Sequence, residues 1–255
     1  MRYDNHMHTF FSADSEMKAE EALEQAERLG LGIVFTEHLD IGLPGEKEFE
    51  FDPEEYWKTY EPLRGKRLLL GVEMGMTQEA REANRAFSER VPFDVVIGSI
   101  HQLMGHDLYY PELYEKMEKG ELYRLYFMTM AREVYQHPFI HVLAHIDYIA
   151  RYATYENPEL EYGEFTEEID TVLGALIATD TLLELNTRRF GNRLAMKELV
   201  PIYCRYRELG GRYITMGSDA HAAASIGANF ALAEEFAEEC DLRVVTFIEG
   251  TMDLC

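Results

Sequence analysis

The stretch that decides the fold is KAEEALEQAERLGLGIVFTEH, residues 18–38. Its first part predicts a helix over Lys18–Leu29, because the alanines and leucines recur at helical spacing. Gly30 and Gly32 mark the end of this helix. The next segment, Ile33–Thr36, is short and β-branched, which predicts a strand, and His38 follows it. The stretch is therefore a helix–strand unit whose strand leads into an ionisable side chain.

The same alternation of short apolar runs and amphipathic stretches continues along the chain. Further strands are predicted over Arg2–His6, Arg67–Glu73, Phe93–Ser99, Phe139–Ala144, Thr181–Asn186, Tyr213–Gly217 and Arg243–Phe247. Further helices are predicted over Gln78–Arg90, Gly120–Tyr135, Glu164–Thr179, Ala195–Leu209 and Ala222–Cys240. Strands without polar alternation are buried on both faces, which with intervening helices predicts an α/β fold with a parallel sheet. Seven or eight such units favour a barrel, with an open doubly wound sheet as the alternative.

Composition limits the class of protein. Of the 255 residues, 47% are hydrophobic, which supplies a full core and makes disorder unlikely by composition. We expect one domain over residues 1–255, since a barrel commonly has this length. The formal charge is −23, from 47 acidic and 24 basic residues, which argues against a nucleic-acid or anionic-membrane partner.

The chain has no long apolar run, and its first residues, MRYDNHMHTF, lack a signal core. A cytoplasmic protein is therefore expected. Cys204, Cys240 and Cys255 show no paired spacing and are expected to be reduced thiols. The oligomeric state is left open by the sequence.

Ionisable side chains gather where predicted strands end. These residues are His6, His8, Glu73, His38, His101, His145, Asp219 and His221. In a parallel barrel the carboxyl ends of all strands open on one face, so these residues are expected to converge. Because buried ionisable groups need compensation, a cation is expected among them, and imidazole with carboxylate suits Zn²⁺, Mn²⁺ or Fe²⁺.

The remaining histidines are interpreted differently. His137 and His141 lie before or inside a predicted strand and are expected to be structural. His106 lies in an expected loop, Gln102–Asp107, over the barrel mouth, and is expected at the surface or beside the substrate. The segment around Trp57 is expected to be a short helix that helps to cover that mouth.

In order and spacing, these motifs resemble those of the PHP (polymerase and histidinol phosphatase) superfamily, and most closely its histidinol-phosphate phosphatase branch. The matching segments are HMHT at 6–9, FTEH at 35–38, GVE at 71–73, GSIH at 98–101, LAHID at 143–147, LELNT at 183–187 and GSDAH at 217–221. The resemblance implies a distorted (β/α)7 TIM-like barrel. It also implies two or three divalent metal ions, of zinc, manganese or iron.

The resemblance further implies the ligand sets. The first ion would be held by His6, His8, Glu73 and Asp219, and Glu73 would bridge to a second ion held by His101 and His145. The third ion would be held by His38, His221 and Asp14. Many members of the superfamily have a histidine where this chain has Asp14, and the alternative for Asp14 is a helix cap or a loop acid.

Clustered cations lower the pKa of a bound water and neutralise phosphoryl oxygens, which predicts phosphate-ester hydrolysis. Glu73, Asp219 and His221 are the candidate catalytic residues, and the proton donor is left open between a bound water, His221 and His106. By similarity to the phosphatase branch, Arg151 and Arg188 would bind the substrate phosphate, and Arg189 would matter less.

The resemblance implies hydrolysis of L-histidinol phosphate to L-histidinol and phosphate, a step of histidine biosynthesis. One alternative is a phosphoesterase of the same superfamily acting on a nucleotide or another small phosphate ester. The other is a non-catalytic module that binds metal. A substrate panel with different metals would distinguish these possibilities.

Overall fold

The computed structural model describes residues 1–45 and 47–254. Its parallel strands are β1 (Tyr3–Met7), β2 (Gly32–Leu39), β3 (Leu68–Gly75), β4 (Val95–Ser99), β7 (Val142–Leu143), β8 (Leu182–Asn186), β9 (Tyr213–Gly217) and β10 (Arg243–Val244). Two small hairpins are formed by β5 (Gln102–Leu103) with β6 (His106–Asp107), and by β11 (Thr246–Ile248) with β12 (Thr251–Asp253).

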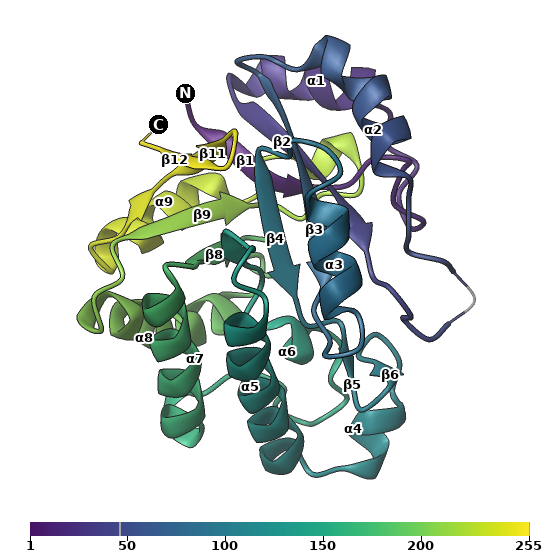
Figure 1. The fold of residues 1–255 in the computed structure, drawn as a ribbon. Coiled ribbons are helices and arrows are strands. Elements are labelled where there is room, and N and C mark those ends of the chain that lie inside the picture. The colour runs from purple at the N-terminus through teal and green to yellow at the C-terminus, as the bar shows by residue number, and fades with distance from the viewer. Residues whose placement is uncertain (46, 255) are drawn as a thin grey trace.

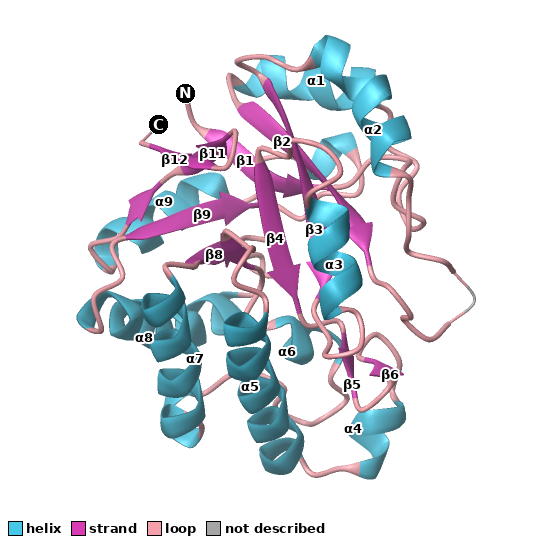
Figure 2. Cartoon of the chain, in the orientation of Figure 1, coloured by secondary structure: helices cyan, strands magenta, loops and turns pink. Residues whose placement is uncertain are grey.

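The helices lie outside the strands (Figures 1 and 2). They are α1 (Ala19–Leu29), α2 (Pro53–Tyr60), α3 (Arg81–Ser88), α4 (Glu112–Lys116), α5 (Lys119–Gln136), α6 (Tyr148–Tyr152), α7 (Thr166–Thr179), α8 (Arg193–Glu208) and α9 (Phe230–Glu239). Within the described ranges, no helix combines the length and apolar content needed to cross a bilayer.

The sheet closes into a distorted barrel. Its strand order is β1-β2-β3-β4-β7-β8-β9-β10, and every pairing in it is parallel. The ends of β1 and β9 then meet, because Met7 forms a parallel bridge with Ala220. In addition, the Asp219 N–H donates to the His6 carbonyl at 2.8 Å. The predicted barrel is confirmed, and the open doubly wound alternative is excluded by this closure.

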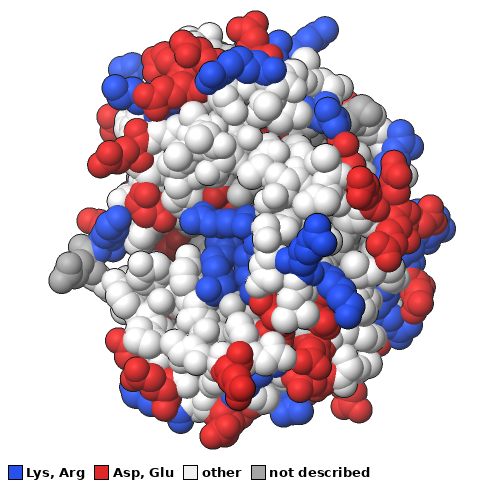
Figure 3. Space-filling view, turned by 180° about the vertical axis from the view of Figure 1, so that it is seen from behind, with Lys and Arg blue, Asp and Glu red and all other residues white. Residues whose placement is uncertain are grey.

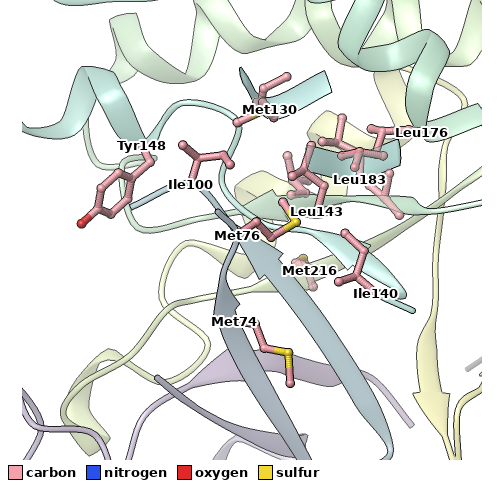
Figure 4. Close-up of a cluster of buried hydrophobic side chains, with 14 of the residues drawn as sticks. Met74, Met76, Ile100, Met130, Ile140, Leu143, Tyr148, Leu176, Leu183 and Met216 are labelled. Carbon is pink, nitrogen blue, oxygen red and sulfur yellow. The ribbon is translucent and has the colours of Figure 1, made fainter. Parts of the chain in front are cut away.

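Alternation along the strands separates the core from the barrel interior. On β3, Leu68, Leu70 and Val72 pack in the main core, whereas Leu69 belongs to a small inner cluster with Val95 and Phe247. Phe247, from β11, thus packs among the apolar side chains of the barrel interior. Figure 4 shows part of the main core, where methionines and leucines fill the space between strands and helices. Since side chains alternate on a strand, the inner face of β3 also carries Glu73.

The structure differs from several of the expected elements. The helix predicted over Ala222–Cys240 is wrong in its first part, because Gly227 and Asn229 have φ angles of 67° and 62°, and α9 begins only at Phe230. The expected loop at residues 102–107 is the β5–β6 hairpin. Strand β7 is shorter than predicted, and the strand predicted over Arg243–Phe247 is divided between β10 and β11.

The expectation for Trp57 was partly wrong. It does lie on a short helix, α2, whose Tyr56 and Tyr60 are buried. The pocket at the barrel mouth, however, is lined by Leu43, Lys47 and Phe49, which precede α2. Cys204 and Cys240 are free thiols in contact with each other, whereas Cys255 lies outside the described residues.

Candidate functional site

The ionisable residues from the strand ends meet around Glu73, which is fully buried. Its Oε2 lies 3.2 Å from His6 Nε2, 3.5 Å from His8 Nε2 and 3.0 Å from His38 Nδ1. The β2–β3 register contributes to this, because His38 is paired directly with Glu73 and both face the interior. His6 and His8, which are two residues apart in the chain, both bring their rings to this same oxygen.

The other oxygen of Glu73 faces a second pair of imidazoles. Its Oε1 lies 2.8 Å from His145 Nε2 and 3.3 Å from His101 Nε2, and it accepts a hydrogen bond from Ser99 at 2.6 Å. Two ligands of one Zn²⁺ at bond lengths of 2.0–2.1 Å are about 3.3 Å apart in tetrahedral geometry. The spacing around both oxygens therefore fits ligands that share ions on either side of Glu73.

A further group lies toward the opening of the barrel. Asp14 Oδ2 is 3.1 Å from His221 Nε2 and 3.7 Å from His38 Nε2. Both imidazoles also contact the ring of His8, with centroids 4.4 and 4.0 Å away. Asp14 caps no helix within the described ranges, and its carboxylate faces both imidazoles of the expected third set. His8 also lies close enough to His38 and His221 to share an ion with them.

Asp219 joins this cluster to the arginines. Its Oδ1 lies 3.5 Å from His8 Nε2. It also accepts from Arg188 Nη1 at 3.2 Å, while Oδ2 accepts from Arg151 Nη1 at 2.7 Å. Arg189 turns elsewhere and pairs with the buried acids Asp147 and Glu159. Arg151 and Arg188 thus lie at the cluster, whereas Arg189 does not.

Three side chains that the sequence interpretation missed hold the imidazoles from behind. Glu184 Oε1 lies 2.7 Å from His6 Nδ1, and Asp40 Oδ1 lies 2.8 Å from His101 Nδ1. His8 Nδ1 lies 3.1 Å from Ser12 Oγ, which donates to Glu37 and therefore accepts from His8. Two of them have a signal in the sequence. Glu184 is a charge inside the apolar run LLELN, and Asp40 follows His38 at i, i+2 spacing.

These contacts fix the tautomers of the three rings. An acceptor at Nδ1 keeps the proton there and leaves the lone pair of Nε2 facing Glu73. Accordingly, His6 Nε2, His8 Nε2 and Glu73 Oε2 are buried but have no hydrogen-bond partner among the described residues. Buried polar atoms are rarely left unpaired, so this donor set fits divalent cations.

The electrostatics of the cluster agree with this donor set for the carboxylates and for His8. Burial alone would raise the pKa of Glu73, but the surrounding imidazoles, His6 first among them, lower it well below its usual value. Burial likewise opposes the ionisation of Asp219, but Arg151, His8, His6 and Arg188 together lower its pKa well below the usual value. The pKa of His8 is lowered well below its usual value by burial and by neighbouring imidazoles. Ionised carboxylates and a neutral imidazole are the forms that bind metal. Against burial, Glu184 and Glu73 raise the pKa of His6, and Glu73 raises that of His38, so these two imidazoles would each lose a proton on binding a metal ion.

Two connected pockets open above the cluster. The inner pocket, about 40 Å³, is lined by His145, Arg151, Asp219 and His221 among others. The outer pocket, about 410 Å³, shares His221 and Arg188 with it and extends toward Phe49 and tyrosines. On the face seen in Figure 3, basic side chains border a hollow in an otherwise mixed surface.

The other histidines lie apart from the cluster. His137 Nδ1 contacts the Glu133 carbonyl at the end of α5, and His141 Nδ1 accepts from the Val96 N–H, as expected for structural residues. His106, on β6, lines an adjoining hollow with Glu112, and this hollow shares Asp107 and Tyr110 with the outer pocket.

Comparison with known proteins identifies the family. The PHP domain model matches residues 4–188, which include all of the cluster except Asp219 and His221. The chain belongs to the PHP domain family. It is 45% identical over 252 residues to a probable histidinol-phosphatase from Clostridium acetobutylicum, with 99% of each chain covered. It is 31% identical over 229 residues to a histidinol-phosphatase from Lactococcus lactis, with 87% of this chain and 85% of that one covered.

A solved structure extends this likeness of the PHP chain to three dimensions. A histidinol phosphate phosphatase from Lactococcus lactis, in complex with zinc, L-histidinol and phosphate, superposes with a TM-score of 0.94. The sequence identity is 29%, and the match covers 99% of this chain and 98% of that one. The distorted TIM-like barrel is therefore shared over nearly the whole length.

The contact between Glu184 and His6 leads to a prediction. Glu184→Gln is expected to weaken metal binding by about 10- to 100-fold, because the carboxylate that fixes the His6 ring loses its charge. Competition with a chromophoric chelator measures this affinity directly. Glu133→Gln is a matched control, since Glu133 is equally buried but lies on α5 and pairs with Arg132. Equal metal affinity in wild type and Glu184→Gln would contradict the assigned role.

Proposed function

We propose that this PHP protein is a metal-dependent phosphomonoesterase that hydrolyses L-histidinol phosphate to L-histidinol and phosphate. The observation that carries the proposal is Arg151 beside the metal-ligand cluster. Its Nη1 donates to Asp219, while Nε and Nη2 are buried without a hydrogen-bond partner among the described residues. Buried, unpaired guanidinium donors at a small pocket suit the oxygens of a phosphate group.

The proposed ligands are those expected from the sequence. One ion would be held by His6, His8, Glu73 and Asp219, a second by Glu73, His101 and His145, and a third by Asp14, His38 and His221. Bound there, divalent ions would supply a water of lowered pKa and neutralise charge on the phosphoryl oxygens. Zinc is supported by the complex of the Lactococcus lactis relative, and manganese and iron also suit this donor set.

The protein's own residues orient the phosphate. Arg151 is held against Asp219 and over the ring of Tyr148, with 5.1 Å from its Cζ to the ring centroid, so its free donors are fixed in direction. Arg188 donates to the Asp219 carbonyl at 2.8 Å and borders both pockets. These two guanidinium groups, which both line the inner pocket, would hold the phosphate while the leaving group extends into the outer pocket.

His221 lines the inner pocket, whereas His106 lines another hollow. Of these two histidines, His221 is therefore the one that a leaving oxygen would meet. We propose it, with Glu73 and Asp219, as part of the catalytic machinery.

The deciding experiment is steady-state phosphate release from a panel of phosphomonoesters, with Zn²⁺, Mn²⁺ and Fe²⁺ each added in turn. The proposal predicts the highest kcat/KM with L-histidinol phosphate. Equal kcat/KM with nucleoside monophosphates would instead favour a phosphoesterase of broader substrate range. No release from any ester with any metal would favour a non-catalytic module. The cytoplasmic location and the lack of a nucleic-acid partner stay predictions.

A further inference from the structure

The outer pocket has an aromatic side. The ring centroids of Tyr109 and Tyr152 lie 4.9 Å apart, and those of Tyr148 and Tyr152 lie 5.4 Å apart. Tyr110 and Phe49 also line the pocket. Aromatic faces attract cations and stack against flat rings. This side therefore suits a leaving group that is flat, positively charged or both.

Asp107 lines the same pocket and is held in place by the β5–β6 hairpin. The hairpin turns at Met104 and Gly105, whose φ angles are 52° and 75°. After the hairpin, the Leu108 N–H donates to the His101 carbonyl at 2.9 Å. The position of Asp107 is thus tied to the backbone of a proposed metal ligand. A carboxylate held in this way can select a substrate by its charge.

Asp107 differs from the other acids of this pocket. Asp40 contacts His101 and Asp14 contacts His221, so both carboxylates face the metal-ligand cluster. Asp107 accepts through Oδ1 from the Tyr109 N–H at 2.8 Å, and within the described ranges its Oδ2 takes part in no hydrogen bond or ion pair. One oxygen of Asp107 is therefore open to a ligand in the outer pocket.

We propose that Asp107 is a specificity residue that binds the ammonium group of the leaving alcohol, with the tyrosines against its ring. The inference rests on the proposed function, because it concerns the other end of the same substrate. An open carboxylate beside aromatic faces attracts a primary ammonium group, whereas a neutral alcohol gains nothing from this charge. Asp107 would thus distinguish amino-alcohol phosphates from other phosphomonoesters.

The test compares two substrates and two variants. The substrates are L-histidinol phosphate and 3-(imidazol-4-yl)propyl phosphate, which has the same shape without the amine. The variants are Asp107→Asn, which keeps the acceptor for Tyr109, and Glu112→Gln, which removes the same charge from an exposed acid in the neighbouring hollow. Kinetic constants for phosphate release are measured for wild type and both variants, with thermal melting as a check of folding.

We expect wild type to prefer the amine-bearing substrate by about 10- to 100-fold in kcat/KM, as for a hydrogen bond to a charged group. Asp107→Asn should lose this preference, chiefly through a higher KM, and should keep its kcat/KM for the deamino substrate. Glu112→Gln should behave as wild type. Equal loss on both substrates, or equal loss in Glu112→Gln, would overturn the inference.

The wild-type comparison tests the inference even if Asp107→Asn does not fold. Wild-type protein that hydrolyses both esters equally well would overturn the role of Asp107 while the phosphatase activity stands. Wild-type protein that hydrolyses neither ester would overturn the proposed function itself, and the inference with it.

Discussion

Glu73→Gln is expected to lower kcat by about 10³-fold or more and to reduce the metal content of the purified protein. The carboxylate contacts imidazoles through both oxygens, with His145 2.8 Å from Oε1 and His38 3.0 Å from Oε2. An amide has one acceptor oxygen and cannot serve both sides. Loss of one preorganised electrostatic group already costs about 10²–10³ in kcat. Phosphate release and elemental analysis measure the two effects.

Glu133→Gln is the control for this substitution. It makes the same chemical change at a buried glutamate outside the cluster, where the partner is Arg132. We expect this control to lose some stability but to keep its metal and its kcat. Full activity in Glu73→Gln, with metal content equal to that of wild type, would refute the bridging role of Glu73.

Arg151→Gln is expected to lower kcat/KM for the phosphate ester by about 10²–10³-fold while the protein stays folded. The substitution removes the buried donors that lack a protein partner, and these would interact with charge that builds up on the phosphate. It also removes the charge that faces Asp219. Steady-state kinetics with thermal melting separate the loss of activity from any loss of stability.

Arg189→Gln provides the contrasting case, because Arg189 pairs with the buried acids Asp147 and Glu159. Leaving buried carboxylates unpaired costs about 3–5 kcal/mol of stability. We therefore expect a lower free energy of unfolding and a kcat close to wild type below the melting transition. If Arg189→Gln lowered kcat as much as Arg151→Gln, phosphate binding could not be assigned to Arg151 in particular.

Much of the site could be predicted from sequence for one physical reason. In a closed parallel barrel, every strand ends at the same mouth, so residues as distant as His8 and Asp219 meet although nothing local links them. Glu73, His38 and His101 were found in the same way. The family resemblance then divided these residues into ligand sets, which stay a prediction. The two oxygens of Glu73 do separate His6 and His8 from His101 and His145, but His38, assigned to the third set, also lies 3.0 Å from Glu73.

Other features depend on contacts that sequence patterns do not carry. Glu184 and Asp40 support the imidazoles through hydrogen bonds to residues distant in the sequence. Their positions in the sequence can suggest buried acids, but do not show which imidazole each one contacts. The β5–β6 hairpin turns at Met104–Gly105, which is not one of the usual two-residue turn sequences. The break before α9 comes from the backbone at Asn229. That residues 1–255 form one domain stays a prediction.

The central claim is that the histidines and acids at the barrel mouth collect divalent cations for the hydrolysis of a phosphate ester. The most direct measurement is phosphate release from L-histidinol phosphate after dialysis against a strong chelator, with elemental analysis of the same sample. The account predicts that activity falls to background as the metal is lost and returns when Zn²⁺, Mn²⁺ or Fe²⁺ is added. Full activity in protein shown to contain no metal would contradict it.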